Sequence, residues 1–426
     1  MPTEGLCMRC KGKGLCGRPY CPTLERFKNN SRVTKALSDK TSVFGPSPPS
    51  VFVGSYNYPS LSAGPLIPPS ADLPELEFGE ASEILREKVV KNPGFMEDSR
   101  LWHDLQMQDV IAMRTALVRA NTTFKPSDAK TDNPLLMKAQ ELALSAKPID
   151  TEAWFKKPII SDLKFDSMMM PMGPSGQVKN FNITENPKVP NAVDRIVYDT
   201  DALAKDAVVE MYQGDVSNEQ MTRLMSIGLL GRDRKLVPTR WSITAIDDMT
   251  GKETIKRIKD YPHIREITLL TGEIFGNHFE ILLLPGSFSY ELLEVWLPQS
   301  VWNGEKTYIG QDHEDFYGKK QYSNLSGGYY AARLPVLEYL DSIKKQAFIF
   351  AIREIRPSYW APLGVWVVRE AARNAVMNPK KQFETKEEAL ADLSKRLITP
   401  RPEWEKETKL LYNQAVQMRI DSFYDY

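Results

Sequence analysis

The chain has 426 residues, of which 42% are hydrophobic and 26% charged, and this composition is typical of a globular protein rather than a disordered one. Its 55 Lys and Arg balance 55 Asp and Glu, which excludes a protein that coats nucleic acid through bulk positive charge but allows a local basic patch. A chain of this length is expected to form two or three domains. No apolar run approaches the roughly 20 residues of a membrane span and no apolar signal segment opens the chain, so we expect a cytoplasmic protein.

A cysteine cluster lies at the start of the chain. All four cysteines of the chain fall within 15 residues, with the spacing C-x2-C-x5-C-x4-C: Cys7, Cys10, Cys16 and Cys21. Two residues between thiols let one turn present both sulfurs to a metal ion, and the intervening glycines permit sharp turns. Four thiolates close a tetrahedral shell, so the pattern predicts a structural Zn²⁺ site with no open position for substrate. An iron–sulfur cluster uses the same ligands, and paired disulfides, rare in cytoplasmic proteins, are the other alternative.

The segment around these cysteines is basic. Residues 1–40 hold nine Lys or Arg against three acids, so we expect a basic zinc module there. Such a module on a neutral body indicates contact with phosphates of nucleic acid. The alternative is that these cations balance thiolate charge and keep the surface soluble.

The next region, residues 41–195, is expected to hold a proline-rich extended segment followed by helices. Residues 44–74 contain eight prolines and cannot form a regular helix, but Val51, Phe52 and Val53 are too apolar for a free linker. We therefore expect an extended chain pressed onto the body. Residues 75–145 have largely helical patterns.

Residues 196–400 are expected to form the core domain, and 401–426 a C-terminal helix and tail. Hydrophobic periodicity predicts strands within 264–296 and at 348–355, and helices at 201–213, 218–230, from about 328, at 363–376 and at 386–397. Ser217 and Gln220 are placed as a capping box for the second of these helices. Because the elements come in blocks without regular βαβ alternation, the sequence predicts an α+β fold, with helices packed on a mostly antiparallel sheet.

A run of charges follows the helix expected at 218–230. Within ten residues stand Arg232, Asp233, Arg234, Lys235 and Arg240. Functional residues concentrate in loops, and guanidinium groups bind phosphate oxygens through paired hydrogen bonds. The four cations are therefore candidates for phosphate or nucleotide binding, and Asp233 and Arg234 for catalysis. An exposed loop with charge pairs is the alternative.

A glycine pair opens the long helix near residue 328. Backbone N–H groups at a helix start, with Gly327 and Gly328 allowing close approach, are typical of an anion site. Tyr329 or Tyr330 could stack a base there, and Arg333 is a further phosphate-binding candidate. The alternative is a plain turn before a helix.

His313 lies among the acidic residues Asp312, Glu314 and Asp315. A histidine beside carboxylates titrates near neutral pH and is therefore a catalytic candidate, although such clusters are commonly surface charge. The Rossmann fingerprint, Walker loop, H-E-x-x-H pair and G-x-S-x-G elbow are absent. Their absence argues against common nucleotide-hydrolase and metalloprotease mechanisms and leaves open whether the protein is an enzyme.

The tail resembles the PIP box with which proteins dock on the sliding clamp PCNA. It reads Gln417-x-x-Ile420-x-x-Phe423-Tyr424. Spacings of three and four place Ile420 and the two aromatics on one face of a helical turn, where they can fill an apolar pocket, while Gln417 sets the register. The alternative is an amphipathic last turn folded back onto its own domain.

With both ends considered, the chain resembles the archaeal Nre family of DNA-repair proteins. The resemblance rests on the cysteine segment, the tail and four internal segments: 50–69 (SVFVGSYNYPSLSAGPLIPP), 231–247 (GRDRKLVPTRWSITAID), 326–340 (SGGYYAARLPVLEYL) and 362–373 (PLGVWVVREAAR). It implies a role in DNA-damage repair, zinc at the four cysteines and clamp binding through the tail.

Three functions are compatible with this sequence. The first is a clamp-recruited DNA-repair factor whose zinc module contacts nucleic acid. The second is a repair enzyme that acts on a nucleotide or nucleotide-like lesion in a pocket built by residues 231–240 and 312–333. The third is an interaction scaffold in which every charged cluster is structural.

Overall fold

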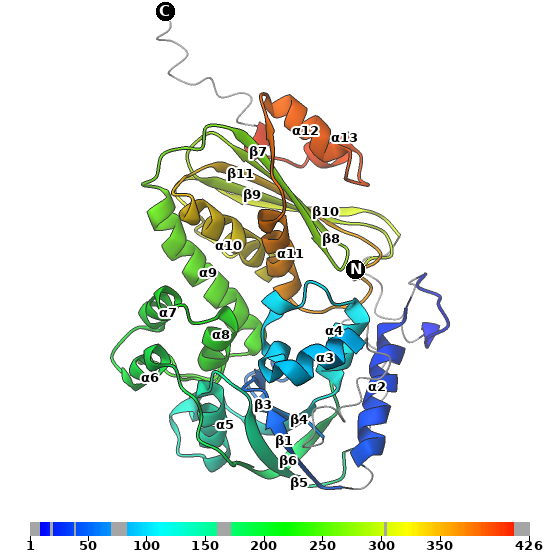
Figure 1. Cartoon of the computed structure of the whole chain (residues 1–426), viewed down its shortest axis with the longest axis vertical. Coiled ribbons are helices and arrows are strands. Elements are labelled where there is room, and N and C mark those ends of the chain that lie inside the picture. The colour runs from blue at the N-terminus through cyan, green and yellow to red at the C-terminus, as the bar shows by residue number, and fades with distance from the viewer. Residues whose placement is uncertain are drawn as a thin grey trace, which may run out of the picture.

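The computed structural model shows two sheets, each with its own helices, that lie one above the other along the long axis of the molecule (Figure 1). It describes residues 9–17, 20–37, 40–69, 83–159, 172–301 and 305–412. The first predicted zinc ligand, Cys7, and the whole clamp-binding pattern at 417–424 therefore lie outside the described residues. Within the described ranges, no helix combines the length and the apolar character that crossing a membrane requires.

The first sheet has the strand order β1-β5-β6-β4-β3-β2. Its strands are β1 (Ser42–Ser47), β2 (Val51–Val53), β3 (Leu61–Ile67), β4 (Val118–Phe124), β5 (Ile149–Phe155) and β6 (Ser175–Ile183). All pairs are antiparallel except β4 and β6. The proline-rich stretch thus supplies three strands, and its apolar residues Val51 and Val53 are buried in the core of this half.

This part of the chain also forms helices, which pack on the first sheet or between the two halves of the molecule. They are α2 (Pro22–Leu37), α3 (Glu83–Lys91), η2 (Pro93–Glu97), η3 (Ser99–Leu101), α4 (Met107–Thr115), η4 (Pro126–Lys130), α5 (Pro134–Leu144), α6 (Asn191–Tyr198), α7 (Ala204–Gln213) and α8 (Asn218–Ser226). The Ser217 hydroxyl caps α8 by accepting from the backbone N–H of Gln220 at 3.2 Å. The Gln220 side chain donates to the Leu144 carbonyl instead of closing a capping box, and α8 ends at Ser226, earlier than expected.

The second sheet has the order β10-β9-β11-β8-β7-β12. Its strands are β7 (Ile267–Ile274), β8 (Asn277–Leu284), β9 (Ser289–Trp296), β10 (Tyr308–Glu314), β11 (Phe348–Ile355) and β12 (Lys381–Phe383). Only β9 and β11 pair in parallel among these described strands. The strands predicted within 264–296 and at 348–355 are confirmed.

Both faces of the second sheet are covered (Figure 1). One face packs on α9 (Thr239–Ile258), α10 (Gly327–Ser342) and α11 (Trp366–Met377), and the other on α12 (Lys386–Ser394) and α13 (Arg401–Glu405). Alternate residues of each strand point to opposite faces. Ile281 therefore packs in the core beneath α9, α10 and α11, and Leu282 in the core beneath α12 and α13. Coverage on both sides explains the continuous burial of β8 and β11.

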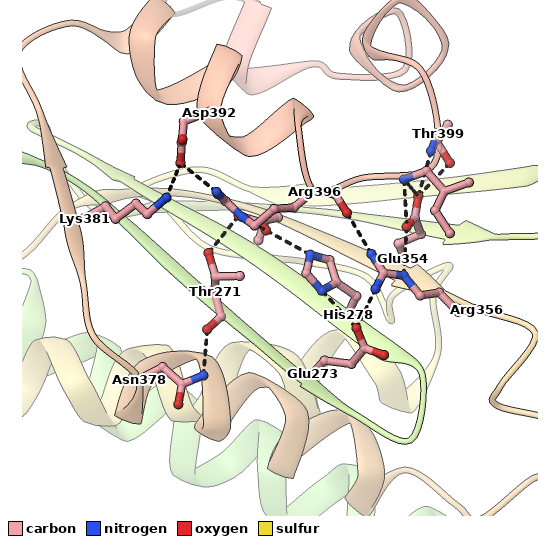
Figure 2. Close-up of polar contacts among 12 residues, drawn as sticks. Thr271, Glu273, His278, Glu354, Arg356, Asn378, Lys381, Asp392, Arg396 and Thr399 are labelled. Carbon is pink, nitrogen blue, oxygen red and sulfur yellow. Dashed lines mark hydrogen bonds and ion pairs between the residues drawn. The ribbon is translucent and has the colours of Figure 1, made fainter.

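The C-terminal segment 386–411, here called the C-terminal cover, is tied to buried carboxylates of this sheet. Glu354 accepts the backbone N–H groups of Ile398 and Thr399 at 3.0 and 2.9 Å (Figure 2). Glu291 accepts those of Leu410 and Leu411 at 3.0 and 2.9 Å. A buried carboxylate needs such donors, so the cover and the sheet satisfy each other.

The prediction of an α+β fold with mostly antiparallel pairing is confirmed. A single sheet was expected, and the described residues form two, because 41–195 contributes strands where mainly extended chain and helices were predicted. These strands contain Pro and Gly and find partners far along the chain, as when Ser42 pairs with Trp154. The proposed division into domains stays a prediction.

Candidate functional site

A cavity of about 770 Å³ opens between the second sheet and the first turns of α9, α10 and α11. This volume is in the range of small-molecule and cofactor sites. Its lining includes Arg240 and Trp241 of α9, Gly327 and Gly328 of α10, and Val365 before α11. Three segments far apart in the sequence therefore meet at one hollow.

Three of the four internal segments that carry the family resemblance line this cavity, and the fourth packs beside it. Segments 231–247, 326–340 and 362–373 line it. The segment 50–69 packs beside it, since the ring centroids of Tyr58 and Trp241 are 5.0 Å apart. Sequence analysis identified the segments one by one, and the fold brings them together.

Arg240 lies at the start of a helix rather than in a loop as predicted, because Pro238 immediately precedes α9 and cannot continue a helix upstream. Its side chain is exposed and its guanidinium lies 6.0 Å from the Trp241 ring. Among the described residues it has no ion pair. It is therefore a cation at the cavity that is free to bind an anion.

The other charged residues of the 231–240 run do not line the cavity. Arg232 and Asp233 are exposed and lie 3.7 Å apart, as a surface charge pair. Lys235 is also exposed. The guanidinium of Arg234 donates to the backbone carbonyls of Val197 and, at 3.4 Å, Gly231, and burial lowers its pKa. The contacts of Arg234 therefore hold the chain in place.

Tyr329 and Arg333 point from α10 toward the sheet. The Tyr329 hydroxyl donates to Glu314 Oε1 at 3.2 Å, and burial raises the pKa of Tyr329 well above its ordinary value. Arg333 is fully buried and pairs with Glu314 at 2.5 Å and Asp248 at 3.2 Å. Both side chains are committed to a buried network beneath the cavity.

The acidic cluster around His313 is divided by the alternation of β10. Asp312 and Glu314 face α10, while His313 points to the opposite face, where its Nδ1 lies 3.1 Å from Gln311 Nε2. Burial opposes ionisation of Asp312, but hydrogen bonds from Lys319 and Ser323 lower its pKa overall. These residues do not converge on one reacting centre.

The sequence analysis did not assign several residues of the cavity to it. Glu294 and Trp296 of β9, Arg353 of β11 and Asp248 of α9 line it. Glu294 Oε1 and Arg353 Nη1 are 2.6 Å apart, and both side chains are buried. A charged residue within an apolar strand is the sequence signal that could have marked this pair. Arg353 and Glu354, adjacent on the strand, point to opposite faces and form separate pairs.

The cysteine segment has the backbone that its glycines predicted. Gly12, Gly14 and Gly17 all have positive φ. Burial by itself would raise the pKa of the Cys10 thiol. Hydrogen bonds from the backbone N–H groups of Leu15, Cys16, Gly12 and Gly14 outweigh this effect, so the pKa is lowered overall and the thiolate is favoured. Within the described residues no three candidate ligands are placed to hold a metal ion, and the remaining cysteine, Cys7, lies outside that part.

Comparisons with known proteins agree over nearly the whole chain. Residues 15–303 match the model of the N-terminal region of archaeal Nre proteins, and residues 314–423 that of their C-terminal region. DNA repair protein NreA of Archaeoglobus fulgidus is 40% identical over 92% of this chain and 93% of its own length. DNA repair protein NreB of the same organism is 34% identical over 91% of this chain and 92% of its own length.

DNA repair protein NreA of Haloferax volcanii is 32% identical over 84% of this chain and 83% of its own. No solved structure matches the fold. The chain belongs to the archaeal Nre family, a family of DNA repair proteins.

Proposed function

We propose that the protein is a DNA-repair factor which the sliding clamp PCNA brings to DNA through Gln417, Ile420, Phe423 and Tyr424. The observation that carries this proposal is the clamp-binding pattern at the end of a chain whose relatives are named DNA repair proteins. Glu291 holds the cover at residues 410–411, a few residues before the pattern. The tail therefore starts from a fixed point of the second sheet.

The proposal includes a structural zinc ion at Cys7, Cys10, Cys16 and Cys21. The backbone N–H groups around the Cys10 thiol suit a metal-bound thiolate. Bound zinc would hold the loop closed and supply no reactive position. The basic residues beside it, such as Lys11 and Lys13, would then contact the phosphates of nucleic acid.

The test of clamp recruitment is titration of PCNA with the full chain and with a chain lacking residues 417–426. We expect the deletion to abolish binding and to leave the melting temperature unchanged, because the anchors of the cover precede it. Replacing both Phe423 and Tyr424 by alanine should weaken binding at least about tenfold, since buried aromatics dominate such contacts. Tyr412→Ala, at an exposed aromatic ahead of the pattern, is the control. Full affinity after the deletion would refute the proposal.

A second candidate function is the binding of a nucleotide or nucleotide-like lesion in the cavity. The observation that favours it is a cavity large enough for a small molecule, lined by Arg240 and by the aromatic ring of Trp241. A guanidinium beside an aromatic ring, with no ion pair in the part of the chain that the structure describes, suits a ligand that carries both a phosphate and a base.

Thermal melting in the presence of mononucleotides tests this candidate. A ligand at a hundred-fold excess over Kd stabilises the native state by about 2.7 kcal/mol. We expect a shift with one class of nucleotide that Arg240→Ala abolishes. Arg232→Ala, which removes an exposed guanidinium outside the cavity, should preserve the shift. Equal shifts in both variants would exclude Arg240 from the site.

A further inference from the structure

The floor of the cavity is lined with carboxylates. Glu294 Oε1 lies so close to the first turn of α10 that a Cβ on Gly328 would be 2.7 Å from it. Asp248 lies on the α9 side of the same cavity. Each carboxylate is paired with a buried arginine, Arg353 and Arg333 respectively. The start of α10 thus already faces a negative group.

This arrangement disfavours a phosphate at the floor. A phosphate beside Gly328 would lie against the Glu294 carboxylate, and Arg353 is already paired with that carboxylate, so the floor offers the phosphate no unpaired cation. Carboxylate oxygens instead accept hydrogen bonds from N–H and O–H groups, which a nucleobase and a sugar carry. The floor therefore suits the base end of a nucleotide.

The mouth of the cavity has the opposite character. Arg240 is exposed there and has no ion pair among the described residues. Trp241 is 43% exposed and packs on Tyr58, which is 53% exposed. On another side of the cavity Tyr322, 62% exposed, packs on Tyr330 at 5.6 Å. A cation beside a partly exposed tryptophan, with further exposed tyrosines near the cavity, is typical of surfaces that bind single-stranded nucleic acid.

We propose that the cavity takes one nucleotide unit of an unpaired nucleic-acid strand, with the base directed to Glu294 and Asp248 and the backbone directed outward to Arg240. The Tyr58–Trp241 pair stacks a neighbouring base of the strand. Enzymes and readers that act on a base take it out of the stack into such a pocket. This inference rests on the proposed nucleotide-binding function and names its substrate class as a strand rather than a free nucleotide.

The experiment measures binding of a labelled single-stranded DNA of about twelve nucleotides by fluorescence anisotropy at fixed salt. The variants Tyr58→Ala and Trp241→Ala are compared with Tyr198→Ala, which removes an exposed tyrosine of α6. Because each stacking variant loses the contact with one base, we expect roughly tenfold weaker DNA binding for Tyr58→Ala and for Trp241→Ala. Tyr198→Ala should bind DNA as tightly as the wild type. The mononucleotide melting shift should persist in Tyr58→Ala, because Tyr58 does not line the cavity. The melting temperatures without ligand show that both stacking variants are folded.

Each outcome decides a different claim. Unchanged DNA affinity in Tyr58→Ala and Trp241→Ala would overturn the inference that the cavity binds a strand. If the mononucleotide melting shift still depends on Arg240, the proposal of a nucleotide pocket would stand. No mononucleotide shift together with DNA binding indifferent to Arg240→Ala would overturn the pocket itself. A duplex of the same sequence that binds as tightly as the single strand would also contradict the inference.

Discussion

His278 lies between two carboxylates on the face of the second sheet that the C-terminal cover packs on (Figure 2). Its Nε2 is 2.9 Å from Glu280 Oε1 and its Nδ1 3.3 Å from Glu273 Oε2. Glu280 in turn pairs with Arg396 of the cover at 2.6 Å. Burial alone would lower the pKa of His278, but the hydrogen bonds to Glu273 and Glu280 raise it above its ordinary value. The imidazolium therefore helps to hold together β7 and β8, the strands that carry Glu273 and Glu280.

These hydrogen bonds predict that the stability of the fold depends on pH. The folded-state pKa of His278 exceeds the unfolded value of about 6.5, so its contribution is complete below that pH and is lost as the pH rises through the folded-state pKa. The contribution of His278 to the free energy of unfolding, measured as the difference between the wild type and His278→Gln, should fall over that range. His278→Gln should remove the dependence, and His263→Gln, at an exposed histidine, should preserve it. A flat pH profile in the wild type would contradict this role.

At the scale of elements, α11 lies directly against β7. A Cβ on Gly272 would be 2.4 Å from the backbone nitrogen of Ala375 and 2.6 Å from its Cα. Backbone atoms cannot move aside as a flexible side chain can. The close approach of helix and strand therefore depends on glycine at this position.

Gly272→Ala should destabilise the protein by about 1–3 kcal/mol, the usual cost of overpacking a core. Denaturant unfolding measures this change. Gly54→Ala is the matched control, because its Cβ would meet its nearest neighbour at 3.5 Å, an ordinary contact. Equal stability of the two variants would mean that α11 can shift without cost.

Elements with strong local patterns were predictable, and those that depend on distant partners were not. The helix α7 and the strands β7–β9 and β11 follow from periodicity and turn residues near their ends. The strands β1 and β3 contain Pro and Gly and were read as extended chain, since their pairing with β5 and β4 is non-local. The start of α9 at Thr239 was expected to be loop, because the helix predicted at 218–230 ends just before the charged run.

At the scale of the whole molecule, the cysteine segment packs beside the cavity of the second half. Tyr20 contacts Trp360 at 5.3 Å, and the neighbouring Tyr359 lines the cavity. Loss of the proposed zinc ion from the cysteine segment should loosen that segment and leave the two sheets intact. The proposed zinc ion is therefore testable apart from the rest of the fold.

Cys16→Ser should lower the zinc content measured by elemental analysis and increase hydrogen exchange only within the described N-terminal residues up to 37. Leu15→Ala, at a neighbouring exposed position, should retain the metal. Absence of zinc from the wild type, or iron with visible absorbance, would refute the zinc assignment in favour of the alternatives.

The sequence by itself determined the class of fold, the family and the separate segments of interest, because these depend on composition, local periodicity and short motifs. Only the tertiary structure decided which candidates share a site. It places Arg240 with Gly327 and Gly328, and directs Arg234 and Arg333 to other partners. The physical reason is that alternation on strands and the crossing of α9, α10 and α11 set the direction of each side chain, and these are properties of packing between distant segments.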